Sequence, residues 1–237
     1  MWLWALLPLS LAVFGTAGIW IVYAISVSNG TVNITERFPY ISECGSYPPQ
    51  STFFSQYCNI CAFLGLWIVA LRFQQVRDYA DHGKANTLSA VLGFLSCVGV
   101  SVLGNFQQSV QRVVHLVGAF TAFFLGVGYF WVQLFLMYQA KPSHDRHWVG
   151  PCRALCCALR TILVITMVVL ARTGHRSAAA LCEWALVMLF FCLFGLFGAE
   201  FRHMDCHQLK VQRHVLQSHC SPVSVVSNHH LTPVHVR

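Results

Sequence analysis

Six blocks of apolar residues, almost free of charged side chains, constrain this chain more than any other feature. They run over about residues 2–27, 53–71, 88–106, 113–138, 154–171 and 178–199. An α-helix rises about 1.5 Å per residue, so blocks of this length cross the roughly 30 Å hydrocarbon core of a bilayer. The block 154–171 reaches that length because Arg160 is expected to extend its guanidinium toward the membrane surface. The pattern predicts an all-α integral membrane protein, a six-transmembrane helix bundle over residues 1–200.

Composition excludes the other broad classes. Of the 237 residues, 56% are hydrophobic and 10% charged, whereas soluble proteins carry about 25% charged residues. A membrane β-barrel would show short segments of alternating polarity, and the run from Val113 to Tyr138 does not alternate. The net charge of +7 comes from Lys and Arg residues that stand singly between apolar blocks, so nucleic acid is not an expected partner.

The distribution of basic residues predicts the orientation, because Lys and Arg are retained in cytosolic connections. With the N-terminus in the cytosol, the cytosolic segments hold Arg72, Arg77, Lys84, Lys141, Arg146, Arg153, Arg160, Arg202, Lys210, Arg213 and Arg237. The opposite side holds Arg37, Arg112, Arg172 and Arg176. Eleven basic residues against four indicate that both termini are cytosolic. The first block lacks a basic leader and is too long for a signal core, so it is read as a retained span.

The connection Ser28–Ser51 is then luminal or extracellular. It holds two N-x-S/T acceptors, so Asn29 and Asn33 are candidates for glycosylation. Cys44 and Cys58 are the cysteines placed for an oxidising compartment, and they are candidates for a disulfide. On the cytosolic side Cys152, Cys156 and Cys157 stand among basic residues at a span end, a setting suited to palmitoylation; simple burial is the alternative.

Polar residues within the blocks admit a functional and a structural interpretation. His115 and Glu183 suggest a proton or ion path, but both lie toward helix ends, which favours a structural role. Gly118, Ala122 and Gly126 form a small-residue ridge that predicts close helix packing within the bundle rather than dimerisation.

Chemistry-bearing motifs are missing from the sequence. It holds no nucleophile elbow, phosphate loop or zinc-helix motif, and the Cys58-Asn59-Ile60-Cys61 pair has no second pair. We therefore expect neither catalysis nor a metal or other cofactor. Residues 201–237 are polar and rich in His, Ser and Val, and they are predicted to form a flexible cytosolic tail.

A family resemblance rests on short segments that occur in order along the chain. They are Pro39-Tyr40-Ile41-Ser42-Glu43-Cys44-Gly45-Ser46-Tyr47-Pro48-Pro49-Gln50-Ser51, Gly104-Asn105-Phe106-Gln107, His115 with Gly118-Ala119-Phe120, and Cys182-Glu183-Trp184. Together they resemble the damage-regulated autophagy modulator family, which includes the transmembrane protein 150 group. The short first loop and the Gly-Asn-Phe-Gln turn are closer to the B branch of that group than to the A branch. Where relatives carry a second loop cysteine this chain has Thr52, which shifts the expected disulfide partner to Cys58.

The resemblance implies a set of landmark residues: Gly45, Pro48, Pro49, Asn105, Gln107, His115, Glu183 and Trp184. Asn105 and Gln107 are expected to cluster with Cys182, Glu183 and Trp184 at the luminal face. The resemblance also implies a non-enzymatic modulator of autophagy and of survival under nutrient stress in endosomal, lysosomal and plasma membranes. An adaptor for a phosphatidylinositol 4-kinase complex or an ion channel is the alternative, and a transporter is favoured least. Beyond the lipid bilayer, unidentified membrane or cytosolic proteins are the expected partners.

Overall fold

The structure, a computed structural model, describes residues 3–79, 83–139 and 146–202. All of them fall within one compact unit, Met1–Asp205. Their elements are α1 (Leu3–Ser28), α2 (Ile41–Cys44), α3 (Gln50–Tyr79), α4 (Gly83–Asn105), α5 (Arg112–Phe120), the π-helix η1 (Thr121–Leu125), α6 (Gly126–Gln139), α7 (Arg146–Arg172), α8 (Arg176–Gly195) and α9 (Phe197–Phe201). The predicted tail lies outside the described residues from position 203 onward.

Six helical stretches are long and apolar enough to cross a membrane, as predicted. They are Leu3–Ser28, Gln50–Asp78, Gly83–Asn105, Arg112–Gln139, Arg146–Arg172 and Arg176–Phe201. The fourth stretch joins α5, η1 and α6, and the sixth joins α8 and α9. The chain is therefore a multi-pass membrane protein, since helices satisfy their own backbone hydrogen bonds in lipid.

Two helices extend well beyond the predicted blocks. α3 continues past position 71 into the charged connection, and α7 begins at Arg146 rather than near position 154. The extension places Arg72 and Arg153 inside the bundle, where each forms an ion pair with Glu200. Charged residues therefore did not mark the ends of these spans, because their charges are compensated within the protein.

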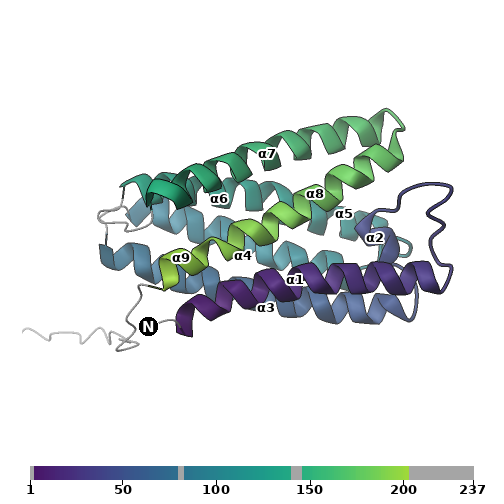
Figure 1. Cartoon of the computed structure of the whole chain (residues 1–237), viewed down its shortest axis with the longest axis horizontal. Helices are drawn as coiled ribbons and strands as arrows, with labels where there is room; N and C mark the ends of the chain where they lie inside the picture. Colours follow the sequence, from purple (N-terminus) through teal and green to yellow (C-terminus); the bar gives the residue numbers. More distant parts are fainter. Residues whose placement is uncertain (1–2, 80–82, 140–145, 203–237) are drawn as a thin grey trace, which may run out of the picture. The chain divides into compact units, whose positions relative to one another are not determined.

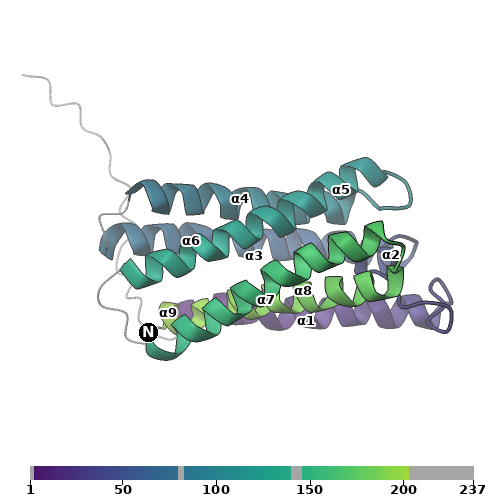
Figure 2. The same cartoon turned by 90° about the horizontal axis from the view of Figure 1, so that it is seen from above.

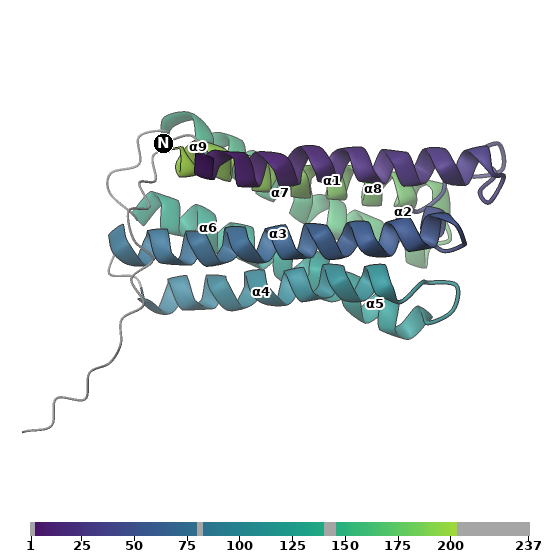
Figure 3. The same ribbon diagram turned by 90° about the horizontal axis from the view of Figure 1, so that it is seen from below.

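The six spans form a closed ring in sequence order. Each span packs against the next one along the chain, and the last, α8 with α9, packs against α1. Figures 1 and 2 show α2 and the start of α5 at one end of this bundle, which we call the loop end. The start of α1 and α9 lie at the opposite end, which we call the terminal end, and Figure 3 shows α1, α3 and α4 side by side.

Aromatic rings fill the inside of the ring. Phe130 of α6 packs edge-on against Phe194 of α8 with a centroid distance of 5.2 Å, and against Phe190 at 6.1 Å. Tyr129 and Phe197 continue the same cluster. Edge-to-face contacts of this kind add to the dispersion energy of packing, which drives helix association where lipid is as apolar as the side chains.

The predicted ridge of small residues packs inside the bundle, against α4. A Cβ atom added at Gly118 would lie 2.8 Å from the backbone nitrogen of Leu103, and one added at Gly99 would lie 2.5 Å from that of Ala122. Ser96 donates to the carbonyl of Ala122, at 2.8 Å, within the π-helix η1. α4 and the α5–η1 segment therefore touch backbone to backbone, which requires glycine on both sides.

We predict that Gly99→Ala destabilises the protein by about 1–3 kcal/mol, because the new methyl group meets backbone atoms that cannot rotate away. Gly128→Ala is the matched control, since its Cβ would lie 3.4 Å from the nearest atom, a side-chain carbon of Leu92. Thermal unfolding of the two purified variants in detergent micelles measures the difference. Equal unfolding midpoints would show that the α4–α5 crossing is looser than described.

Candidate functional site

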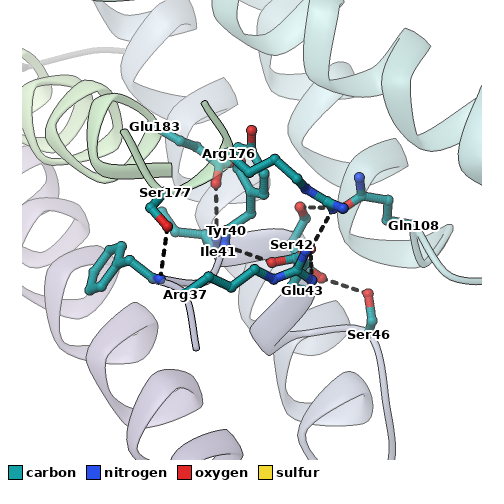
Figure 4. A network of polar contacts seen from close by, with 11 residues as sticks. Arg37, Tyr40, Ile41, Ser42, Glu43, Ser46, Gln108, Arg176, Ser177 and Glu183 are labelled. Atoms are coloured by element: carbon teal, nitrogen blue, oxygen red, sulfur yellow. Dashed lines mark hydrogen bonds and ion pairs between the residues drawn. The ribbon is translucent and has the colours of Figure 1, made fainter. Parts of the chain in front are cut away.

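The segment between α1 and α3, which we call the first connection, folds over the loop end of the bundle. Glu43 of the short helix α2 within it holds it there. Its Oε2 accepts a hydrogen bond from the backbone N–H of Tyr40, at 3.1 Å. Its Oε1 forms ion pairs with Arg37 at 2.9 Å and with Arg176 of α8 at 3.0 Å. One carboxylate thus closes the short helix α2 and ties it to the sixth span (Figure 4).

Two landmark residues of α8 hold the same connection from inside. The Oε2 of Glu183 accepts a hydrogen bond from the backbone N–H of Ile41, at 2.8 Å. The indole N–H of Trp184 donates to the carbonyl of Pro39, at 3.0 Å, and its ring packs against Trp20 of α1 with a centroid distance of 4.8 Å. Glu183 and Trp184 therefore bind the backbone of the first connection, and Figure 4 shows Glu183 pointing toward Ile41.

The opposite side of the connection is bound to the turn between α4 and α5. The hydroxyl of Ser42 donates to Oε1 of Gln108, at 2.6 Å, and the hydroxyl of Ser109 donates to the carbonyl of Ser46, at 3.3 Å. Gly45 packs its Cα against the ring of Phe54, which a Cβ there would approach within 2.5 Å. The connection is thus clamped between α8 and the α4–α5 turn.

The remaining landmarks build that turn and the start of α3. Nδ1 of His115 lies 2.9 Å from the carbonyl of Leu103 and 2.8 Å from that of Phe106, so the ring binds the end of α4. The amide of Asn105 donates to Oδ1 of Asn59 of α3, at 2.9 Å. The carbonyl of Gln107 accepts the N–H groups of residues 110 and 111, and the exposed Pro48 and Pro49 lead into α3.

The expected cluster of landmarks divides into two contact sets at the same end of the bundle. Glu183 and Trp184 contact the first connection, whereas Asn105 contacts α3 and Gln107 forms the turn. In the described residues no hydrogen bond joins Asn105 or Gln107 directly to Glu183, and Ser42 with Gln108 connects the two sides. The sequence indicated the right end of the bundle but not this division.

A narrow cavity of about 70 Å³ lies beneath α2. Ser42, His115 and Glu183 line it at the loop end, and aromatic, aliphatic and cysteine side chains line the rest as far as Gly65 and Phe194. Glu183 and Phe194 are about three helical turns apart, which is about 16 Å along α8. The cavity is therefore small and mostly apolar, with polar groups at one end.

Buried charges gather at the terminal end, where the sequence analysis did not place a site. Glu200 pairs with Arg72 of α3 at 2.9 Å and with Arg153 of α7 at 2.6 Å, and all three side chains are buried. Arg72 also donates to Gln133 of α6, at 2.8 Å, which donates to Ser89 of α4, at 2.7 Å. The network joins five of the six spans. Its signal in the sequence was the position of Arg72, Arg153 and Glu200 close to the edges of apolar blocks.

The structure contradicts the expectation that the side chain of Arg160 extends to the membrane surface. Because α7 begins at Arg146, Arg160 lies near the middle of the helix, and its side chain is 1% exposed. Its guanidinium stacks between the rings of Phe190, at 4.7 Å, and Phe130, at 5.5 Å. Among the described residues none accepts a hydrogen bond from it. Cation–π contacts with the two rings offset part of the cost of burying this charge.

The cysteine candidates have different surroundings. Cys44 and Cys58 are both buried, and both are free cysteines. They face different helices, since Cys44 faces Ser26 of α1 and Cys58 faces Gly104 of α4. The structure therefore lacks the expected disulfide. Cys152 is exposed, Cys156 is half-buried and Cys157 is buried. Burial removes Cys157 from the candidates for acylation in the folded protein and leaves the other two.

A metal site is not found in the part of the chain that the structure describes, where no group of three potential ligand side chains converges. The polar groups at the loop end bind backbone and each other rather than presenting a nucleophile beside a base. The geometry favours holding the loop and enclosing the cavity.

Comparison with known proteins gives a consistent picture. Residues 3–204 match the family described as the Frag1/DRAM/Sfk1/Cwh43P N-terminal domain. A protein of Danio rerio named modulator of macroautophagy TMEM150B is 59% identical over 92% of this chain and 94% of its own length. The human protein of the same name is 46% identical over 88% of this chain and 90% of its own length. Transmembrane protein 150A of Xenopus laevis is 32% identical over 84% of this chain and 83% of its own length. No solved structure matches the chain.

We predict that Glu200→Gln destabilises the protein by about 3–5 kcal/mol, because it leaves the buried guanidinium groups of Arg72 and Arg153 without their carboxylate. Glu36→Gln is the control, since Glu36 is exposed in the first connection. Unfolding in mixed micelles, followed by circular dichroism, compares the two. Equal stability would mean that the network contributes little to the fold.

We also predict that Cys44 reacts slowly with a membrane-impermeant maleimide at pH 8. Its side chain is 1% exposed, and burial raises the pKa of the thiol from 9.0 to about 11. Because the folded-state pKa is raised, this group's contribution to stability is present below pH 9 and is lost as the pH rises through about 11.

A cysteine introduced by Tyr47→Cys, at a position 52% exposed, serves as the reactive control. Peptide mapping by mass spectrometry reads both sites in one sample. Equal labelling of the two sites at pH 8 would show that α2 opens readily.

Proposed function

Because this chain belongs to the Frag1/DRAM/Sfk1/Cwh43P N-terminal domain family, we propose that it modulates autophagy from within a membrane. The observation that carries the proposal is the 59% identity, over 92% of the chain, with a relative named modulator of macroautophagy. We further propose that it acts without catalysing a reaction, in endosomal, lysosomal and plasma membranes, and supports survival under nutrient stress. Fold alone would not support this step, which rests on similarity along the whole bundle.

The contacts of the ionisable groups support a role exerted through contacts with other molecules. His115 binds the carbonyl groups at the end of α4, and Glu183 binds the backbone of Ile41. Transport would favour ionisable groups along a polar path near the middle of the spans, whereas the mid-span Arg160 is enclosed by the rings of Phe130 and Phe190. The cavity between the two loop-end groups and the middle of the bundle is instead lined mostly by apolar side chains.

The outward face of α7 offers a surface for such contacts. Along it runs a stripe of exposed apolar side chains, Leu155, Leu159, Ile162, Ile165 and Val169. Cys152 and Cys156 lie near the terminal end of the same helix and remain candidates for palmitoylation. This face meets lipid and, in our proposal, a membrane-embedded protein partner.

We propose that both termini are cytosolic, which places the loop end in the lumen or outside the cell. The eleven-to-four distribution of Lys and Arg supports this orientation, as does the location of both N-x-S/T acceptors at the loop end. The acceptors differ in their surroundings. Nδ2 of Asn29, the atom that would be glycosylated, donates to Gln50 at 2.8 Å, whereas the exposed Asn33 has its Oδ1 bound by Thr35.

We predict that Asn33 carries the glycan, because its amide nitrogen does not have to break the contact that Asn29 makes with α3. Asn33→Gln should abolish the endoglycosidase-sensitive change in gel mobility, and Asn29→Gln should leave it in place. Loss of the change in Asn29→Gln alone would reverse the assignment. A wild-type chain without any glycan would count against a luminal loop end.

Autophagic flux tests the proposed function. Cells lacking the protein are compared with cells re-expressing it, with and without a blocker of lysosomal degradation. We expect flux to change on loss, and re-expression to restore it. Unchanged flux would contradict the proposal and favour the adaptor alternative.

The alternatives make different predictions for variants. An adaptor for a phosphatidylinositol 4-kinase complex or for an ion channel should lose activity when the chain ends after Phe201. A transporter should survive that truncation and fail on His115→Ala or Glu183→Gln. The contacts of His115 and Glu183 with backbone favour the adaptor over the transporter.

A further inference from the structure

We propose that a groove between α3 and α4 holds one acyl chain of an anionic glycerophospholipid, whose phosphate group pairs with Arg77 and Lys84. The proposal goes beyond modulation of autophagy and does not depend on it. It rests on the size and lining of the groove and on two basic side chains that lie in line with its two walls.

The groove lies on the outside of the bundle, between two helices that Figure 3 shows side by side. Its lining comes from residues 66–73 of α3 and residues 87–95 of α4. Its volume of about 380 Å³ falls within the range of about 300–1,000 Å³ found for ligand pockets. The cavity beneath α2, at about 70 Å³, is much smaller. Val91 and Phe94 of the lining are exposed, so the groove opens toward the surrounding lipid.

The lining favours an acyl chain over a polar ligand. All of its side chains are apolar except that of Thr87, whose hydroxyl donates to the carbonyl of Gly83 within α4, at 2.7 Å. The walls of the groove are helices that cross the membrane, so an acyl chain can lie along it without leaving the direction of its neighbours in the bilayer. The lining of α3 extends about 10 Å, from Leu66 to Phe73, which is enough for part of one chain. Dispersion contacts with both helices then hold the chain.

Two basic side chains lie beyond the terminal end of the groove. Arg77 follows Phe73 by four residues on α3, and Lys84 precedes Thr87 by three residues on α4. Residues three or four apart share one face of a helix, so each basic residue continues one wall of the groove. Both side chains are exposed. The chain position and the position of the charges therefore match a lipid whose head group lies at the terminal end.

The charges at this end favour an anionic head group. Asp78 lies 3.7 Å from Nε of Arg77, but the two side chains are 67% and 62% exposed, and exposed pairs of this kind contribute little. Arg77 can therefore exchange this contact for a phosphate, which a guanidinium binds through paired hydrogen bonds. Residues 80–82, which include Asp81, lie outside the described residues. A sterol or a helix of a partner protein could fill the groove, but neither would use the two basic residues.

Photo-crosslinking of the full chain in nanodiscs tests the proposal. Three probes carry the same diazirine-bearing acyl chain on phosphatidylserine, phosphatidylinositol or phosphatidylcholine, and peptide mapping locates the label. We expect at least one of the two anionic probes to label residues 66–73 and 87–95 in a saturable manner and more strongly than phosphatidylcholine does. The stronger of the two anionic probes identifies the preferred head group. Equal labelling by all three probes, or competition by unlabelled cholesterol but not by the unlabelled anionic lipid, would overturn the proposal.

A pair of double variants tests the two basic residues. Arg77→Gln combined with Lys84→Gln should lower the preference for the anionic probe over phosphatidylcholine at least about fivefold, since each basic residue near the surface strengthens binding of anionic lipid. The control combines Arg112→Gln with Arg172→Gln, which removes the same charge from exposed positions near the loop end. The control should keep the preference of the wild type. An equal loss in both double variants would mean that net charge, and not this site, attracts the lipid.

A second pair of variants tests the groove itself. Ala70 lines the groove, whereas Ala17 is exposed on α1 and lies outside it. Ala70→Phe fills the groove and should abolish saturable labelling of its walls, and Ala17→Phe should leave that labelling in place. Full labelling of a folded Ala70→Phe protein would contradict the proposal. If Ala70→Phe does not fold, the double variants decide, because they change only exposed side chains.

Discussion

The carboxylate of Glu200 holds the terminal half of the bundle together. A guanidinium buried in hydrocarbon is costly unless a counter-charge and hydrogen-bond partners accompany it, and Glu200 supplies the counter-charge to both Arg72 and Arg153. These three residues come from the second, fifth and sixth spans, so the ion pairs fix spans that are distant in sequence. Gln133 and Ser89 extend the network to the fourth and third spans. Apolar packing alone would allow the helices to slide or rotate, whereas directional charge-assisted contacts define one arrangement.

The need of a buried charge for a counter-charge also explains which parts of the fold the sequence could predict and which it could not. Apolar blocks identified six spans because hydrocarbon length sets helix length, and every predicted block lies mostly within a described helix. Span ends near Arg72 and Arg153 were misplaced because a charge usually marks the membrane surface, and periodicity cannot show that Glu200, which is distant in the sequence, will neutralise both charges. Arg160 was misplaced because periodicity cannot show that the rings of Phe130 and Phe190 will enclose its guanidinium.

The candidate site was located from the sequence but not resolved into its contacts. Landmark residues indicated the loop end, yet the binding of Glu183 to the backbone of Ile41 depends on how the first connection folds back over the sixth span. The cavity is also invisible to patterning, because its lining residues look like ordinary core residues of α2 and of five spans. The two ends of the bundle thus use polar groups differently: one joins five of the six spans by ion pairs and hydrogen bonds, and the other holds a loop over a mostly apolar cavity.

The closure of the ring has a consequence for how the protein is made. α1 leaves the ribosome first, yet part of its packing face, including Gly15 against Phe191, belongs to a partner that is synthesised last. At about 5–20 residues per second, translation delays that partner by roughly 10–30 s. During this interval the side of α1 that holds Gly15 lacks its partner from α8, whereas Gly18 can already pack against Tyr57 of α3. Errors in the sixth span therefore leave only the α8-facing side of the first span unpaired, since its other side still packs against α3.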